Sequence, residues 1–301
     1  MAHTHIHWQA WALAIRPRTL PAGAAGVVMG SALAWAEGRF RLGAFLACLA
    51  AALLLQIGSN LANDVFDFER GTDTPERLGP TRVTQSGLLS PAQVKGGMAV
   101  VFGLAALLGL YVASLGGWPI IAVGIAAILA AVAYTGGPFP LGYHGLGELF
   151  VFIFFGLASV AGTYFVQAGA VSSAAWWMTL PPGFIITAIL VVNNLRDIDL
   201  DRKGQKLTLA VRLGEGLTKG EYLACMSAAY LVLPLAALIG VVPWWALLAW
   251  LSLPLAFRAT RVVWTQKGRP LNAALADTGL AALLFSLLFW VGLLVSRTMK
   301  G

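Results

Sequence analysis

Charged residues are scarce in this chain, and that scarcity excludes an ordinary soluble protein. Asp, Glu, Lys and Arg together make up 11% of the 301 residues, whereas hydrophobic residues make up 58%. Soluble globular domains average about 25% charged residues. The composition is therefore typical of a protein that crosses a membrane many times, and it predicts an all-α integral membrane protein.

Several other features are missing. Cys48 and Cys225 are the only cysteines, both inside predicted spans and without a CxxC motif, so we expect packing roles and no disulfide. The N-terminus lacks the basic region and small-residue cleavage site of a secretory signal, and we expect no cleavage. No basic cluster with interleaved aromatic residues suggests nucleic acid. The net charge of +7 suits anionic lipid at the inner leaflet instead.

Long apolar runs fill most of the remaining sequence. A helix needs about 20 mostly apolar residues to cross the hydrocarbon core. Nine windows of roughly that length are bounded by charge, Gly or Pro. The window at 243–258 is the weakest because it is short and contains Pro254, so eight spans remain an alternative. The predicted spans are 19–36, 42–62, 96–115, 118–135, 147–167, 175–195, 221–240, 243–258 and 276–296.

The distribution of basic residues predicts the orientation of these spans. With the N-terminus inside, sixteen Lys and Arg residues fall on the cytoplasmic side, which basic loops favour, and four fall outside. The outer four are Arg39, Arg41, Arg297 and Lys300. We therefore predict an N-in, C-out topology with an odd number of spans and with the acidic loops in the cytoplasm.

Two cytoplasmic loops are long and rich in charge, and they open alike. The first, at about 60–95, begins NLANDVFDFERGTD, and the second, at 193–220, begins NNLRDIDLD. Each has an Asn four residues before an Asp, followed by a second Asp. This repeat predicts two related halves whose equivalent helix ends face each other across a central cavity. The matching residues are Asn60, Asp64 and Asp67 in the first loop and Asn193, Asp197 and Asp201 in the second.

The paired acids predict a metal site if the preceding helices continue into the loops. Residues three or four apart then share a helix face, and carboxylates on one face repel unless a cation neutralises them. Oxygen ligands without His or Cys suit Mg²⁺ completed by phosphate oxygens, and not Zn²⁺. We predict two or more Mg²⁺ ions bridged by a substrate diphosphate. The predicted metal ligands and catalytic residues are Asp64, Asp67, Asp197 and Asp201.

Basic and amide side chains between the acids are candidates for binding the diphosphate oxygens that Mg²⁺ leaves free. A solvated loop with ordinary ion pairs is the alternative interpretation of the charges. The recurrence of the pattern in two loops favours the metal and diphosphate site. The candidates are Asn60, Arg77, Arg82, Asn193, Arg196 and Lys206, with Arg202 and Arg212 as further possibilities.

These motifs resemble those of the UbiA-type intramembrane aromatic prenyltransferases. Asn60-x-x-Asn63-Asp64-x-x-Asp67 looks like the first aspartate-rich motif of that family, and Asn193-Asn194-x-Arg196-Asp197-x-x-x-Asp201 looks like the second. A Gly at position 71, where many members have a third acid, followed by Asp73, resembles the branch that prenylates 1,4-dihydroxy-2-naphthoate in menaquinone synthesis. The phrases RPRTLPA, RLGPTRVTQSGLLS, GGPFPLGYHGLGE and KLTLAVRLGE resemble the same branch.

The chain departs from that branch at one position of the second loop. The branch usually has Gly immediately before the Lys of the motif, whereas this chain has Gln205. We expect Gly204 to supply the turn instead, leaving Lys206 and Thr208 in register.

The resemblance implies a single prenyltransferase domain over residues 1–301. Its expected fold is a nine-helix bundle with a cavity open to cytoplasm and lipid, capped by the two loops. The implied reaction is Mg²⁺-dependent transfer of a polyprenyl group from its diphosphate to 1,4-dihydroxy-2-naphthoate, with loss of CO₂, giving demethylmenaquinone and diphosphate. The implied location is the cytoplasmic membrane of a bacterium, so the expected partners are the two substrates and the lipid bilayer.

The aromatic acceptor needs its own residues in the same cavity. We expect Arg16 or Arg18 to bind the acceptor carboxylate. Tyr143 or His144 is a candidate for deprotonating a ring hydroxyl, although both could instead be membrane-interface residues. The residues expected near the ring are Asn63, Tyr134, Tyr143 and Glu148.

Two alternative functions remain open from the sequence. The nearer one is prenylation of another acceptor, namely 4-hydroxybenzoate, homogentisate or haem, and Gly71 and Asp73 are the main discriminators. The other is transport, since internal repeats and intramembrane charges are also typical of transporters. The acids lie at the ends of spans and in loops, whereas an ion pathway needs polar groups near the midplane.

Overall fold

Helices form almost the whole chain in the computed structural model, which describes residues 2–73 and 76–299 and the side chains from residue 8 onward. The predicted all-α class is confirmed. The longer helices are α1 (Ala2–Ile15), α2 (Leu20–Ala36), α3 (Leu42–Glu69), α4 (Pro91–Gly116), α5 (Trp118–Ala133), α9 (Leu180–Lys203), α10 (Leu209–Leu238), α11 (Leu253–Thr265) and α12 (Leu271–Thr298). The shorter ones are η1 (Pro17–Thr19), η2 (Leu141–His144), α6 (Gly147–Val151), η3 (Phe152–Ala161), α7 (Gly162–Ala168), α8 (Ser173–Trp177) and η4 (Trp244–Ser252).

Eight helical segments of the described residues are long and apolar enough to cross a membrane. The remaining predicted span, 118–135, corresponds to α5, which is apolar but only 16 residues long. The window at 243–258, predicted as the weakest, instead lies within the 22-residue segment Trp244–Thr265. Pro254 does not interrupt it, because Pro254 lies in the first turn of α11, where a missing N–H costs nothing.

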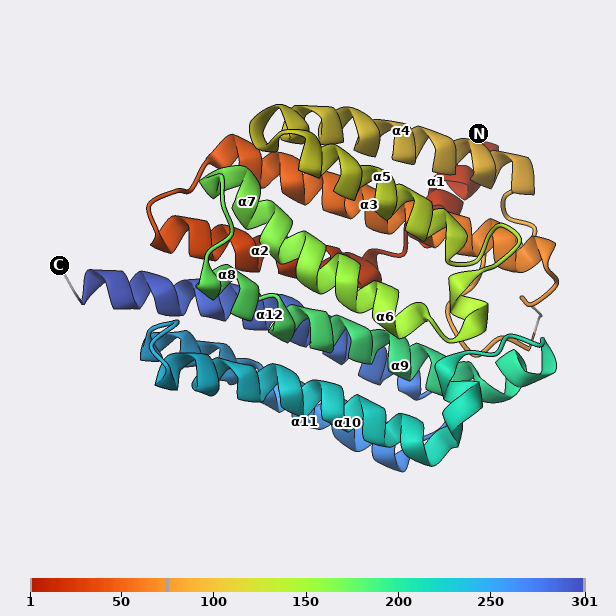
Figure 1. Cartoon of the computed structure of the whole chain (residues 1–301). Helices are drawn as coiled ribbons and strands as arrows, with labels where there is room; N and C mark the ends of the chain where they lie inside the picture. The colour runs from red at the N-terminus through yellow and green to blue at the C-terminus, as the bar shows by residue number, and fades with distance from the viewer. Residues whose placement is uncertain (1, 74–75, 300–301) are drawn as a thin grey trace.

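The long helices lie side by side in one bundle (Figure 1). Helices α3, α4 and α5 form one side of it, and α10 and α11 form the other, with α2, α9 and α12 between them. Helix α1 and the two charged loops lie at the same end of the bundle, whereas α12 ends at the opposite end. This arrangement agrees with the predicted placement of the N-terminus on the side of the acidic loops.

Small residues allow close approach of the helices at the centre of the bundle. A Cβ added to Gly156 in η3 would lie 2.8 Å from the Cα of Gly183 in α9. A Cβ added to Gly26 in α2 would lie 2.8 Å from the carbonyl oxygen of Phe155. Since apolar side chains gain little by leaving lipid for another helix, such close packing supplies much of the attraction between spans.

A cavity of about 1100 Å³ lies inside the bundle. Its wall comes from α2, α3, α4, α5, η3, α9 and α12 and consists mostly of apolar side chains. Arg16, Arg77, Arg82 and Lys206 gather with several amide side chains in the wall's polar part. The predicted central cavity is therefore present.

The two acidic motifs lie on helices, as the metal prediction required. Helix α3 continues seven residues past the predicted end of its span at residue 62, and α9 continues eight residues past residue 195. Asp67 and Asp201 thus belong to the last turns of α3 and α9. Beyond α3, the loop ends at α4, where Ser90 and Gln93 form a capping box and Pro91 starts the helix.

Close packing at Gly292 of α12 yields the first prediction. A Cβ at this position would overlap the backbone carbonyl of Trp245 and would lie 3.0 Å from the Cα of Ala246. We expect Gly292→Ala to destabilise the protein by about 1–3 kcal/mol through overpacking. Thermal unfolding in detergent measures the effect. Gly103→Ala on α4, where nothing lies within 4 Å of the added Cβ, is the matched control; equal melting temperatures for the two variants would contradict the packing described.

Candidate active site

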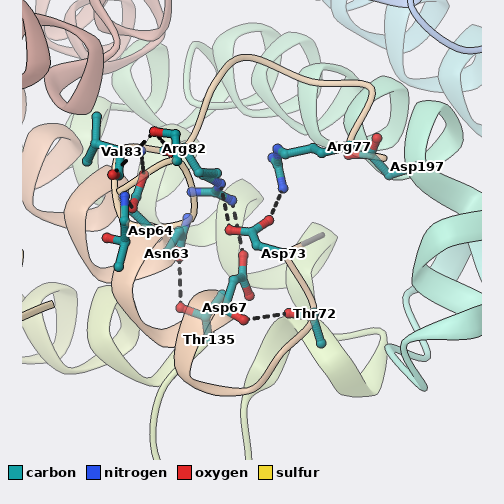
Figure 2. Close-up of polar contacts among 12 residues, drawn as sticks. Asn63, Asp64, Asp67, Thr72, Asp73, Arg77, Arg82, Val83, Thr135 and Asp197 are labelled. Atoms are coloured by element: carbon teal, nitrogen blue, oxygen red, sulfur yellow. Dashed lines mark hydrogen bonds and ion pairs between the residues drawn. The ribbon is translucent and has the colours of Figure 1, made fainter. Parts of the chain in front are cut away.

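A small pocket lined by charged side chains lies where α3 and α9 end. It shares Asp67, Arg77, Arg82, Asn193 and Lys206 with the large cavity, so the two adjoin at the cavity's polar part. Figure 2 shows its first half, with Asp67, Asp73, Arg77 and Arg82 close together. The lining residues are Asp67, Thr72, Asp73, Arg77, Arg82, Asn193, Asp197, Leu200, Asp201 and Lys206.

Asp67 is the best-connected carboxylate of this pocket. It is 2% exposed and accepts hydrogen bonds from Tyr143 Oη at 2.9 Å and Arg82 Nη2 at 3.0 Å. Lys206 Nζ lies 4.0 Å from Oδ1. Burial by itself would lower the pKa of Lys206, but the carboxylates of Asp67 and Asp201 outweigh it and raise that pKa above its usual value. Lys206 therefore stays protonated in the pocket.

Asp73 lies beside Asp67, although only a motif resemblance had singled it out. Arg82 Nε is 3.1 Å from Asp73 Oδ2, and Arg77 pairs with Oδ1. Burial raises the pKa of Asp73 to about 6, an effect to which Asp67 adds and which Arg77 opposes. Asp73 is therefore a fourth pocket carboxylate together with Asp67, Asp197 and Asp201.

The turn at Gly71 explains how Asp73 reaches this position. Gly71 has φ +70°, in the left-handed region that Gly tolerates best. The N–H of Thr72 then donates to the carbonyl of Asp67 at 3.0 Å, which closes the end of α3 and turns the chain back on itself. The residue at position 71 thus acts through the backbone.

The second motif ends with an equivalent turn at Gln205. The N–H of Lys206 donates to the carbonyl of Asp201 at 2.8 Å, as Thr72 does to Asp67. Gln205 has φ +56°, whereas Gly204 has φ −80°. The expectation that Gly204 supplies the turn is wrong. The left-handed residue comes four positions after the acid in both motifs, which explains why Gly is favoured there, and Gln205 adopts that conformation at a cost of about 1 kcal/mol.

Asp64 faces away from the pocket and organises the loop instead. Its two carboxylate oxygens accept from the backbone N–H groups of Val83, at 3.1 Å, and Thr84, at 2.9 Å (Figure 2). Arg16 Nη2 lies 3.6 Å from Oδ2. Asp64 and Asp67, which the sequence pairs as ligands of one site, therefore bind different groups of the same loop segment: Asp64 binds backbone N–H groups, whereas Asp67 binds the Arg82 side chain.

Arg196 is already engaged by protein groups. Its side chain is buried, with Nε donating to Asp197 Oδ1 at 2.9 Å and Nη2 donating to Asn193 Oδ1 at 2.9 Å. Nη1 donates to Asn272 Oδ1 at 2.8 Å. Because Arg has five N–H groups, little donor capacity is left for a diphosphate.

Three further diphosphate candidates lie outside the charged pocket. Asn60 donates to the carbonyl of Ile15 at 2.9 Å and to Thr19 Oγ1 at 2.9 Å, so it ties the N-terminal segment to α3. Arg202 is exposed and lies 3.9 Å from Asp199. Arg212 donates to the carbonyl of Leu207. The structure brings together Arg77, Arg82, Asn193 and Lys206.

The predicted acceptor residues divide into two groups. Arg16, Arg18, Asn63 and Tyr134 line the large cavity. Arg16 has a left-handed backbone, with φ +55°, and its buried Nε has no hydrogen-bond partner among the described residues. Non-Gly residues with positive φ are uncommon and concentrate at functional sites. Arg16 is therefore the more distinctive of the two candidate carboxylate partners.

The other acceptor candidates are bound to protein groups. Tyr143 donates to Asp67, and burial together with that carboxylate raises the Tyr143 pKa above its usual value. His144 Nδ1 lies 2.8 Å from the carbonyl oxygen of Pro140, a geometry in which it donates. Glu148 is buried and accepts from Asn194 Nδ2 at 2.8 Å. Tyr143 and His144 thus act as donors here, which disfavours their predicted role as bases.

The pocket carboxylates are not arranged as a set of metal ligands in this structure. Among the described residues, no group of three His, Cys, Asp or Glu side chains is arranged to hold a metal ion. Arg82 lies between Asp67 and Asp73, and Arg196 occupies Asp197. The donor set nevertheless suits Mg²⁺, because four carboxylates line the pocket against three cations, Arg77, Arg82 and Lys206.

Comparison with known proteins identifies the family. A model of the UbiA prenyltransferase family matches residues 24–286. The chain is 38% identical over 297 residues to the 1,4-dihydroxy-2-naphthoate octaprenyltransferase of Escherichia coli strain K12, with 96% of each chain covered. It is 41% identical over 279 residues to the Mycobacterium tuberculosis (strain ATCC 25618 / H37Rv) protein of the same name, covering 92% of this chain and 94% of that one.

A solved structure supports the fold. A UbiA homolog from Archaeoglobus fulgidus bound to DMAPP and Mg²⁺ matches with a TM-score of 0.65 and 12% identity, covering 95% of this chain and 99% of that chain. The resemblance inferred from the aspartate-rich motifs is thus confirmed by both sequence and fold. The chain belongs to the UbiA prenyltransferase family.

Proposed function

We propose that this protein transfers a polyprenyl group from polyprenyl diphosphate to 1,4-dihydroxy-2-naphthoate, with loss of CO₂, giving diphosphate and demethylmenaquinone in its reduced, quinol form. The observation that carries the proposal is a pocket of four carboxylates and three cations at the end of an apolar cavity of about 1100 Å³. The acceptor follows from the names of the relatives and from the Gly71 and Asp73 variation.

Asp67, Asp73, Asp197 and Asp201 are the residues that would hold Mg²⁺. When bound, Mg²⁺ would neutralise the leaving diphosphate, so that the bond from the allylic carbon to oxygen breaks with both electrons on oxygen. Asp73 replaces Asp64 in this set, because Asp64 is occupied by two backbone N–H groups. The number of ions, two or more, remains part of the proposal.

The cations of the pocket would exchange partners when the substrate binds. Arg77 and Arg82 now neutralise Asp67 and Asp73. With Mg²⁺ held by those carboxylates, Arg77 and Arg82 would be available to bind diphosphate oxygens, for which their planar guanidinium groups are well suited. Lys206 and Asn193 line the same pocket and would complete the set. The pocket thus stays nearly neutral with and without substrate.

The apolar cavity would hold the prenyl chain and the ring. Burying each CH₂ gains about 0.8 kcal/mol, so a long prenyl chain leaves lipid only if an apolar wall receives it. The same wall excludes water, which would otherwise capture the allylic carbon before the ring attacks it. We propose that the cavity opens to cytoplasm and lipid, and that α5 is a ninth span of an N-in protein in a bacterial cytoplasmic membrane.

Arg16 is proposed as the partner of the acceptor carboxylate. It lines the cavity beside Asn60 and Asn63, and its backbone conformation directs a buried guanidinium with an unpaired Nε toward the site. Asn63 accepts from Thr135 at 3.1 Å, so its amide N–H₂ is free to donate to the ring substituents. Tyr134 completes the proposed acceptor wall.

The substrate assignment is tested with membranes that contain the protein. Incubated with a polyprenyl diphosphate and Mg²⁺, they are expected to prenylate labelled 1,4-dihydroxy-2-naphthoate with release of CO₂, and chelation of Mg²⁺ is expected to stop the reaction. Labelled 4-hydroxybenzoate is the competing acceptor. Prenylation of 4-hydroxybenzoate and not of the naphthoate would overturn the assignment.

Substitution of the pocket carboxylates tests their proposed role in metal binding. We expect Asp67→Asn and Asp201→Asn each to lower kcat by about 100-fold or more, because each removes a charge that would bind the metal. Asp199→Asn is the matched control, since the Asp199 side chain is 85% exposed on the same helix as Asp201. Steady-state prenylation in detergent at saturating substrates measures kcat. Near-normal rates in the first two variants would refute the metal role.

The acceptor proposal distinguishes Arg16 from Arg18. We expect Arg16→Gln to raise KM for the naphthoate about tenfold or more, with a smaller change in KM for the polyprenyl diphosphate, because a charged hydrogen bond to carboxylate contributes roughly 1.5–3 kcal/mol. Arg18→Gln, an exposed neighbour on the same turn, is expected to change neither value. Steady-state kinetics with each substrate varied in turn measure both KM values. If Arg18→Gln raised KM for the naphthoate and Arg16→Gln did not, Arg18 would be the partner of the acceptor carboxylate.

A further inference from the structure

Asn272, in the first turn of α12, contacts both halves of the site although it belongs to neither acidic motif. Its Oδ1 accepts from Arg196 Nη1 at 2.8 Å, and its Nδ2 donates to the carbonyl oxygen of Leu78 at 2.9 Å. Arg196 lies on α9, and Leu78 lies in the loop that follows α3. One amide therefore joins three segments that are far apart in the sequence.

Arg196 is held on its other edge by the second motif itself. Nε donates to Asp197 Oδ1 at 2.9 Å, Nη2 pairs with Asp197 Oδ2, and Nη2 also donates to Asn193 Oδ1 at 2.9 Å. With Nη1 on Asn272, every nitrogen of the guanidinium has a protein partner. The orientation of the Asp197 carboxylate is thus tied to that of Arg196.

Gly79 closes the remaining side of the guanidinium. A Cβ added at Gly79 would lie 2.7 Å from Arg196 Nη2 and 2.9 Å from Cζ. The loop backbone therefore packs directly against the guanidinium, immediately after the residue whose carbonyl Asn272 binds. Only a residue without a side chain leaves room for this contact.

We infer that Asn272 is a positioning residue for the metal and diphosphate pocket, acting through Arg196 on the Asp197 carboxylate and through Leu78 on the loop that carries Arg77 and Arg82. The inference rests on the proposed function, because it assigns Asp197 to a metal-binding set. Without the Asn272 amide, Nη1 of a buried Arg loses its acceptor, and the orientation of the guanidinium and of the Asp197 carboxylate bound to it is no longer fixed from the α12 side. The two halves of the pocket also lose a direct link.

The expected consequence is a weaker metal site in a folded protein. Partners that orient a metal ligand typically change metal affinity by about 10–100-fold when removed. A residue that only helped α12 to pack would lower the melting temperature and leave the Mg²⁺ requirement unchanged. The Mg²⁺ concentration that gives half-maximal stabilisation or half-maximal turnover therefore distinguishes a positioning role from a packing role.

Two variants alter different contacts of the Arg196 guanidinium. Asn272→Ala removes its acceptor, and Gly79→Ala places a methyl group against Nη2. Ser286→Ala is the control on α12, since Ser286 is buried and its hydroxyl donates only to Ala282 of its own helix. Gly96→Ala is the control for the glycine, since nothing lies within 4 Å of a Cβ added there.

The measurement is the thermal stabilisation of each purified protein by Mg²⁺ with inorganic pyrophosphate, repeated over a range of Mg²⁺ concentrations and paired with the Mg²⁺ dependence of turnover. We expect Asn272→Ala and Gly79→Ala to raise the half-saturating Mg²⁺ concentration about tenfold or more in both assays, with both controls unchanged.

Other outcomes would overturn the inference. Unchanged Mg²⁺ requirements in both variants would leave Asn272 only a packing role, and if Asn272→Ala fails to fold, Gly79→Ala decides alone. If the unsubstituted protein itself gains no stability from Mg²⁺ and pyrophosphate, the proposed metal site fails and the role of Asn272 fails with it. Those two failures are distinguished by the unsubstituted protein.

Discussion

Two carboxylates buried side by side share one guanidinium, and much of the site depends on that arrangement. Arg82 Nη2 lies 3.0 Å from Asp67, and its Nε lies 3.1 Å from Asp73. An unpaired buried carboxylate costs several kcal/mol, so the loop after α3 has to fold back over the helix end to bring Arg82 into place. The turn at Gly71 makes that path possible. The pocket therefore depends on pairing the buried carboxylates at the end of α3 with the guanidinium group of Arg82.

The same requirement shapes the cavity mouth. Asp64 is matched by two backbone N–H groups of the loop and by Arg16, and Asn60 binds the carbonyl that precedes Arg16. The N-terminal segment, α3 and the first loop are thus joined by polar contacts where the apolar wall ends. This junction places charged groups for a diphosphate beside an apolar space for a prenyl chain. One substrate can therefore bind through its diphosphate and its prenyl chain at the same time.

Much of the fold could be predicted from the sequence because hydropathy has a simple physical meaning in a bilayer. Each predicted window corresponds to an apolar helix, and the repeated acids do lie at equivalent helix ends. The roles of individual residues could not be predicted in the same way. Asp64 and Asp67 share a spacing that suits one metal site, yet Asp64 accepts hydrogen bonds from backbone N–H groups 19 and 20 residues away. Gly204 was the expected turn residue, but the hydrogen bond to Asp201 places the left-handed conformation at Gln205.

By itself the sequence determined the class of the protein, its apolar helices and the two acidic motifs that identify its family, because these depend on composition and on spacing along one chain. Only the tertiary structure decided which acids line one pocket and that Asp73 lies there with Asp67. It also decided that Arg196 donates a hydrogen bond to Asn272. Those facts depend on contacts between α9, α12 and the loop that follows α3, where Asn272 binds a residue 194 positions away. A hydrogen bond over such a separation leaves no periodic pattern in the sequence, so the residue that joins the two halves of the site became visible only after the chain was folded.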